Sequence, residues 1–347
     1  MRIETANSRE DGFTMIEMVI ATMMLLVLSF LVTSMIMSGN AAQKYADRLG
    51  RVTEITQEIL DDMSYELQEA VRLFEDTMQG NAYLARLQPW PEAPPIASSR
   101  MPRFKVSGIL DKDLAGTEAT GNDFLFVRHA WVDTFVCTSG NAYSLDVYRL
   151  VRYYMKTEGA GPTSAYPFGL NLVKWTSEPA VSGAQVDKVT DPVDQAEVLK
   201  HLHDGSLDAE GVSHTPLNLV WMLGQDPTTA GTFRQILPGG TLALAPAPPR
   251  TTVWEFERDD RLSSPGLLFY RHHSIATNYS QANKGVARFG IRNDLFNGIG
   301  FPHGLEFQVV GSAAARKVLL HMTTVSTNVK GMRAFYDGQT IVVVREG

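Results

Sequence analysis

The feature that most limits how this chain can fold is a long apolar run near its start. From Phe13 to Met37 there are 25 residues, of which 19 are apolar, and Glu17 carries the only charge. No glycine or proline interrupts the run. A helix of this length would span roughly 38 Å, whereas a bilayer core is about 30 Å thick. The run therefore predicts a helix that crosses a membrane once.

The composition as a whole is that of a folded protein with an acidic balance. The chain has 347 residues, is 44% hydrophobic and carries a formal net charge of -7. Its length predicts one large or two ordinary domains. Because no block of Lys or Arg is present, we expect no direct binding of nucleic acid, which uses a basic patch. Cys137 is the only cysteine, so an intrachain disulfide is excluded, and we interpret Cys137 as a small buried hydrophobe.

Two ordinary targeting signals compete to explain the apolar run. A cleaved secretory signal has an apolar region of about 7–15 residues after a basic start, and this run is longer. A signal anchor predicts an excess of Lys or Arg on the cytoplasmic side, but the first 12 residues hold two arginines and three acids. Neither signal explains why Glu17 lies inside the run.

The stretch GFTMIE at residues 12–17 explains the acid, because it resembles the processing site of type IV prepilins and type II secretion pseudopilins. The usual family pattern is Gly-Phe-Thr-Leu-Ile-Glu, from which Met15 is a conservative departure. The resemblance implies that a prepilin peptidase cleaves between Gly12 and Phe13 and methylates the new amine of Phe13. It also implies that Glu17 pairs with the amine of Phe13 on a neighbouring subunit and so sets the register of assembly.

The same resemblance implies a location and a set of partners. The chain would sit in the bacterial inner membrane with its head in the periplasm, and then enter a pilus or pseudopilus. Its partners would be the prepilin peptidase, other pilins or pseudopilins through the N-terminal helix, an inner-membrane assembly platform and the lipid bilayer. The large head and the run without Gly or Pro favour a minor pilin or a pseudopilin. We expect the subunit not to be an enzyme and to need no cofactor. Which machine it serves stays open.

Helical periodicity continues beyond the apolar run. Apolar residues recur at steps of three or four, and charged residues lie between them, which is typical of an amphipathic helix; these positions are Tyr45, Leu49, Val52, Ile55, Ile59, Met63, Leu67, Val71 and Phe74. We expect a continuous helix to about Met78, stopped by Gly80 and Asn81. The predicted segments are a leader at 1–12, a membrane or filament-core helix at 13–38, its amphipathic continuation at 39–80 and a head at 81–347.

The head reads as strands and turns. Short runs rich in β-branched and aromatic residues predict strands at 124–132, 143–147, 251–257, 267–275, 305–310, 317–325 and 340–344. Residues 191–204 predict a short helix capped by Asp191, and 157–167 and 238–249 read as loops. The predicted fold class is α+β, with a long N-terminal helix packed on a C-terminal antiparallel sheet.

Motifs for catalysis are scarce in this sequence. It has no phosphate-binding loop, dinucleotide-binding glycine pattern, HExxH or GxSxG. The best candidate for metal binding is His201, His203 and Asp204, although histidines two residues apart diverge on a helix and converge only on a strand. A membrane-anchored enzyme, or a module that binds a metal or another ligand, is the alternative function, with an ordinary signal anchor at its start.

Overall fold

The computed structural model describes most of the chain in several stretches, namely residues 14–86, 99–108, 110, 120–156, 169–245, 250–256, 273–276, 304–327 and 333–346. The predicted leader, the predicted loop at 157–167 and the first part of the predicted strand at 267–275 lie outside the described residues. The chain divides into two compact units, residues 1–50 and 51–347, and each is described by itself.

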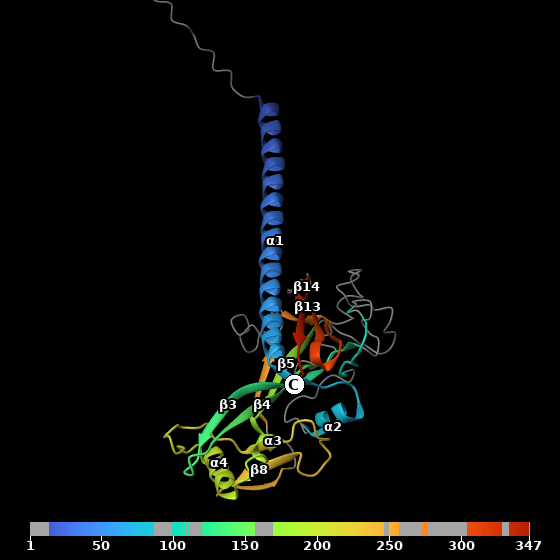
Figure 1. The fold of residues 1–347 in the computed structure, drawn as a ribbon. Coiled ribbons are helices and arrows are strands. Elements are labelled where there is room, and N and C mark those ends of the chain that lie inside the picture. Colours follow the sequence, from blue (N-terminus) through green and yellow to red (C-terminus); the bar gives the residue numbers. More distant parts are fainter. Residues whose placement is uncertain are drawn as a thin grey trace, which may run out of the picture. The chain divides into compact units, whose positions relative to one another are not determined.

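The helices and strands follow in the order drawn in Figure 1. The helices are α1 (Met15–Gln68), α2 (Met78–Arg86), α3 (Gly183–Val186), α4 (Pro192–Asp204) and the 3₁₀ helix η4 (Ala313–Ala315). The strands are β1 (Ala70–Leu73), β2 (Thr120–Gly121), β3 (Phe124–Val136), β4 (Ala142–Lys156), β5 (Gly169–Ser177), β6 (Ala180–Ser182), β7 (Leu219–Trp221), β8 (Phe233–Leu237), β9 (Thr241–Leu244), β10 (Arg250–Phe256), β11 (His273–Ala276), β12 (Leu305–Val310), β13 (Arg316–Thr327) and β14 (Arg333–Val344).

The described strands of the second unit join into one sheet. Its main path is β2-β12-β13-β11-β5-β4-β6-β7-β8-β9, with β1 and β4 paired to β3, β10 to β5 and β14 to β13. Most pairs are antiparallel, as predicted, but β6 and β7 are parallel. The fold is therefore α+β, as predicted, with one parallel pair in a sheet that is otherwise antiparallel among the described strands.

The part of α1 in the second unit packs its predicted apolar stripe on this sheet. The buried residues of the helix are Val52, Ile55, Thr56, Ile59, Leu60, Met63, Glu66 and Leu67. They face a core cluster that includes Phe126, Phe307 and Met322 from β3, β12 and β13. The stripe predicted from Val52 to Leu67 is confirmed, because every apolar position assigned to it there is buried.

Polar side chains fix the same helix surface. Lys174 Nζ on β5 lies 2.9 Å from Asp62 and 2.8 Å from Glu66. The hydroxyl of Tyr153 on β4 donates to Glu66 at 3.1 Å. Glu66 is 5% exposed, so the ammonium and the hydroxyl supply the partners that a buried carboxylate needs.

Helix α1 ends at Gln68, ten residues earlier than the sequence predicts. Residues Ala70–Leu73 form β1, an edge strand that pairs with β3. The apolar spacing misleads here because Val71 and Phe74, the last two positions of the predicted stripe, pack against a second core cluster, with Val71 as part of β1. Gly80 likewise lies inside α2 instead of ending a helix.

Other predicted elements are present with different lengths. Strand β12 has the predicted bounds, whereas β3, β4, β13 and β14 extend further than expected. Residues 241–244, predicted to be loop, form β9. Helix α4 begins as predicted, because the Asp191 side chain accepts a hydrogen bond from the backbone N–H of Val193 at 2.8 Å. It lies beside β8 (Figure 1) over a third core cluster that includes Cys137, Val198 and Leu202.

Candidate functional site

The predicted processing site lies at the border of the described residues. Gly12 and Phe13, the expected points of cleavage and methylation, lie outside them. The described chain starts at Thr14, and α1 begins at Met15. Glu17, the expected assembly residue, is exposed in the first turn of this helix.

Thr14 and Glu17 close the start of α1 by a reciprocal pair of contacts. The backbone N–H and the hydroxyl of Thr14 donate to Glu17 Oε2 at 2.9 and 2.8 Å. The backbone N–H of Glu17 points back at Thr14 Oγ1 at 3.4 Å. This is a capping box, with Thr14 at the N-cap and the acid three residues later. The Thr-x-x-Glu spacing in the sequence could have revealed this second role for Glu17.

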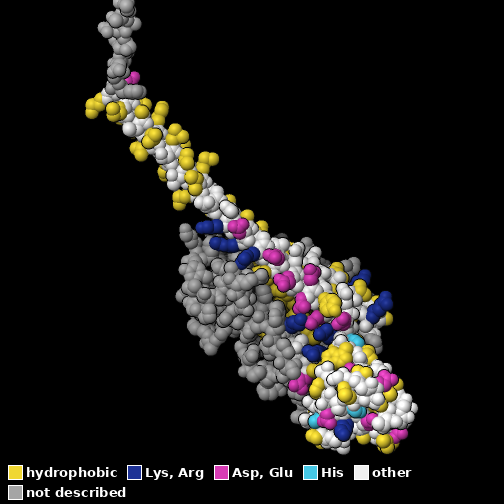
Figure 2. Space-filling model, turned by 90° about the vertical axis from the view of Figure 1, so that its left-hand side faces the viewer, with side chains coloured by type: hydrophobic (Ala, Val, Ile, Leu, Met, Phe, Trp, Pro, Cys, Tyr) yellow, Lys and Arg dark blue, Asp and Glu magenta, His cyan; other side chains and the backbone are white. Residues whose placement is uncertain are grey.

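The helix beyond Glu17 exposes an uninterrupted apolar surface within the first unit. All 17 large hydrophobic side chains between Met15 and Met37 are exposed, and hydrophobic side chains cover the side of this segment seen in Figure 2. Leaving them in water instead of burying them costs on the order of tens of kcal/mol. Among the described residues, α1 is the one helix long and apolar enough to cross a membrane.

A polar side chain inside this run is satisfied by the helix itself. The hydroxyl of Thr22 donates to the carbonyl oxygens of Met18 and Val19, both at 2.9 Å. A hydroxyl bonded in this way needs no water, so Thr22 is compatible with an apolar surrounding.

His201 and His203, the weak candidates for a metal site, do not point toward one common position. They lie on α4, where His201 Nδ1 is 2.7 Å from Ser206 Oγ and His203 Nδ1 is 2.8 Å from Asp204. Two positions apart on a helix, the two imidazoles point to different sides. The metal site predicted from these residues is therefore not formed by the described structure.

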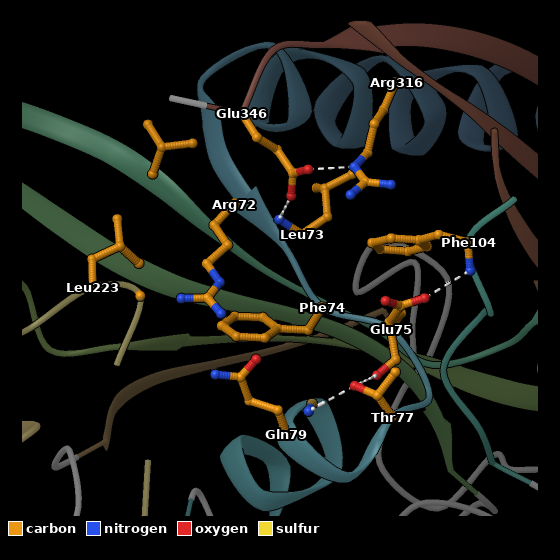
Figure 3. Close-up of a pocket in the computed structure, with 13 residues that line it drawn as sticks. Arg72, Leu73, Phe74, Glu75, Thr77, Gln79, Phe104, Leu223, Arg316 and Glu346 are labelled. Carbon is orange, nitrogen blue, oxygen red and sulfur yellow. Dashed lines mark hydrogen bonds and ion pairs between the residues drawn. The ribbon is translucent and has the colours of Figure 1, made fainter. Parts of the chain in front are cut away.

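A cavity of about 440 Å³ opens beside β1 and the start of α2 in the second unit. Figure 3 shows Arg72 on one side of it and Arg316 on the other. Arg316 pairs with Glu346, whose Oε1 also accepts from the backbone N–H of Leu73 at 2.7 Å. Arg72 lies over Phe74, 5.2 Å from the ring centre, and has no carboxylate partner among the residues described. Glu75 also lines the cavity, so the charged residues of its lining are two arginines and two glutamates.

Three strands share a buried imidazole elsewhere in the head. His321 on β13 is 5% exposed, with Nδ1 2.9 Å from Glu306 on β12 and Nε2 hydrogen-bonded to Asp337 on β14. Burial by itself lowers the pKa of His321, but the hydrogen bonds to Asp337 and Glu306 outweigh it and raise the pKa to about 10. The imidazole is therefore charged at neutral pH, and both ring nitrogens are engaged, so it is held as a structural cation.

Comparison with known proteins gives no match to a protein-family model, a curated protein or a solved structure. The assignment of a function therefore depends on the residues of this chain and on the surfaces described above.

Proposed function

We propose that this chain is a non-catalytic structural subunit of a bacterial type IV pilus or type II secretion pseudopilus. The observation that carries the proposal is the position of GFTMIE, whose last three residues open helix α1 with its fully exposed apolar surface. The size of the head favours a minor subunit. Prepilin peptidase would cut between Gly12 and Phe13 and methylate Phe13.

Lipid and neighbouring subunits would cover the apolar helix in turn. The single membrane-length helix holds the subunit in the inner membrane, with the head in the periplasm, until an assembly platform extracts it. Packing against the equivalent helices of other pilins or pseudopilins would then replace the lipid contacts. This replacement offsets the cost of tens of kcal/mol that exposure to water would impose. A separate cytoplasmic ATPase would drive the machine, so the chain itself would need no nucleotide site.

Glu17 would serve two functions in succession. Before assembly, its contacts with Thr14 satisfy the start of the helix. Because Glu17 is exposed, its carboxylate can exchange these contacts for the charged amine of Phe13 on a neighbouring subunit. An ionisable group in a membrane segment is costly without a partner, and this amine is a partner of the right charge.

Mass spectrometry of the mature N-terminus tests the proposal. In a host that has a prepilin peptidase, we expect the protein to begin at N-methylated Phe13. In a matched host that lacks the peptidase, we expect an intact Met1. An intact Met1 in both hosts, or cleavage near Ala42, would contradict the proposal.

The second candidate is a membrane-anchored module that binds a ligand, and the cavity between Arg72 and Arg316 in Figure 3 favours it. Such a module would keep an ordinary signal anchor. The N-terminus found by mass spectrometry distinguishes the two candidates.

A further inference from the structure

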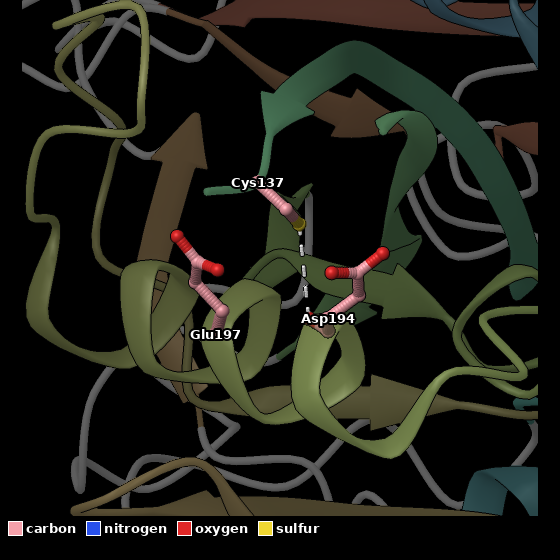
Figure 4. A group of neighbouring side chains, drawn as sticks. All are labelled: Cys137, Asp194 and Glu197. Carbon is pink, nitrogen blue, oxygen red and sulfur yellow. Dashed lines mark hydrogen bonds between the residues drawn. The ribbon is translucent and has the colours of Figure 1, made fainter. Parts of the chain in front are cut away.

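Cys137 lies opposite two carboxylates of α4 in the second unit. The cysteine follows β3 directly, and Asp194 and Glu197 stand three residues apart on the helix. The thiol sulfur and one oxygen from each carboxylate all lie within 4.8 Å of one another. Figure 4 shows the three side chains converging from the two elements.

The two oxygens of the Asp194 carboxylate differ in their hydrogen bonding. Its Oδ2 accepts hydrogen bonds from Asn141 Nδ2 and from the Tyr143 hydroxyl, both at 2.8 Å. Its Oδ1 is buried and accepts no hydrogen bond of good geometry among the described residues. The Ser139 side chain is a further hydrogen-bond partner of this carboxylate, and Asp194 is only 1% exposed. A carboxylate oxygen of Asp194 is directed at the space between Cys137 and Glu197 (Figure 4). An unsatisfied buried carboxylate oxygen is costly, and a cation in that space would satisfy it.

Glu197 is also oriented by a neighbour. Its carboxylate accepts from the backbone N–H of Thr138 at 3.1 Å and from the Thr138 hydroxyl at 2.8 Å. The side chain is 18% exposed, which leaves a route from solvent to the cluster. Hydrogen bonds that orient the ligating carboxylates are typical of metal sites, where such outer partners fix the ligands.

We propose that Cys137, Asp194 and Glu197 bind one divalent cation of the zinc class. A thiolate sulfur selects against calcium and magnesium, which take oxygen ligands. Zinc binds sulfur at about 2.3 Å and carboxylate oxygen at about 2.0–2.2 Å, with four ligands in a tetrahedron. Three protein ligands leave the fourth position to water at the exposed side. The ligand atoms would need to close by about 1 Å to reach the spacing of a tetrahedral site.

Binding would be coupled to loss of a proton. The sulfur species that binds a metal is the thiolate. Binding therefore breaks the S–H bond of Cys137, forms a sulfur–metal bond and releases one proton to solvent.

The test is a cobalt titration of the full-length protein in detergent, after treatment with a chelator. Cobalt(II) reports on the proposed ligand because a thiolate bound to it gives a charge-transfer absorption band. We expect one equivalent to bind with this band and zinc to displace it. Cys137→Ser should abolish the band, and Glu197→Gln should weaken binding about tenfold or more.

The matched control is His203→Ala on the same helix, which should bind cobalt as the unaltered protein does. Because Cys137 and Asp194 are buried, a substitution there could unfold the protein, so the melting temperature of each metal-free variant is measured as a check of folding. Glu197 is partly exposed, and Glu197→Gln therefore tests the site without a change in the core. Absence of stoichiometric binding, or binding that Cys137→Ser leaves unchanged, would overturn the proposal. Loss of binding in His203→Ala would place the metal at the histidines instead.

Discussion

At the scale of single residues, Glu17 has a local explanation and an intermolecular one. The local one is the capping box with Thr14, which Glu or Gln can complete equally. The intermolecular one is the proposed ion pair with the amine of Phe13 on a neighbouring subunit, which only a charged side chain can make. A change from acid to amide therefore separates the two roles.

We expect Glu17→Gln to keep the start of the helix and yet to reduce incorporation into pili or pseudopili strongly. Thr14→Ala, which removes the cap hydroxyl and costs about 1 kcal/mol, should leave incorporation largely intact because the charge of Glu17 remains. The measurement is the amount of subunit in purified filaments relative to the amount in the membrane. Normal incorporation of Glu17→Gln would remove the assembly role and leave the cap as the function of this acid.

At the scale of elements, the charged imidazole of His321 on β13 links β12 and β14 through Glu306 and Asp337. Glu306 lies directly across from it on β12, and Asp337 lies one step diagonally away on β14. The folded protein therefore holds the His321 proton up to about pH 10, whereas an unfolded histidine releases it near pH 6.5. The stabilisation is complete below about pH 6.5 and is lost as pH rises toward 10.

We expect His321→Gln to lower the free energy of unfolding by about 3–5 kcal/mol at neutral pH, because Glu306 and Asp337 lose their cation. The difference from the unaltered protein should shrink as pH rises from 7 to 10. Thermal or denaturant unfolding of the detergent-solubilised chain at several pH values measures it. The control His203→Gln, which changes a solvent-accessible pair, should shift stability by under about 1 kcal/mol. Parallel pH profiles for His321→Gln and the unaltered protein would contradict the assignment.

Elements with a clear local signal could be predicted from the sequence, whereas β1 and the cluster at Cys137 could not, because both depend on residues far away in the chain. The start of α4 follows from Asp191 and Pro192, two neighbouring residues with defined preferences at a helix start. Strand β1 depends on pairing with β3, more than 50 residues away, and its apolar spacing also suits a helix. The cluster of Cys137 with Asp194 and Glu197 joins residues almost 60 positions apart, so no local motif reveals it.

At the scale of the whole molecule, the two units differ in where their apolar side chains lie. Between Met15 and Met37 the large hydrophobic residues are exposed, whereas all buried core residues among those described lie beyond Gly50. A core of this size can hold a domain together on its own, and a segment with a continuous apolar surface needs lipid or protein around it. The chain thus combines a segment that is stable only in lipid or against other protein with a head that has its own hydrophobic core.

A variant that lacks residues 1–38 tests this division. We expect it to remain folded and monomeric without detergent, because every core residue of the second unit is retained and the exposed run is removed. The full chain should aggregate when detergent is withdrawn. Size-exclusion chromatography and circular dichroism give the measurement. If the head melts at the same temperature in the truncated variant and in the full-length chain, the apolar segment contributes nothing to the stability of the head. If the truncated chain is unfolded, the apolar helix must contribute to the core of the head, and its role as a separable membrane or filament segment would be wrong.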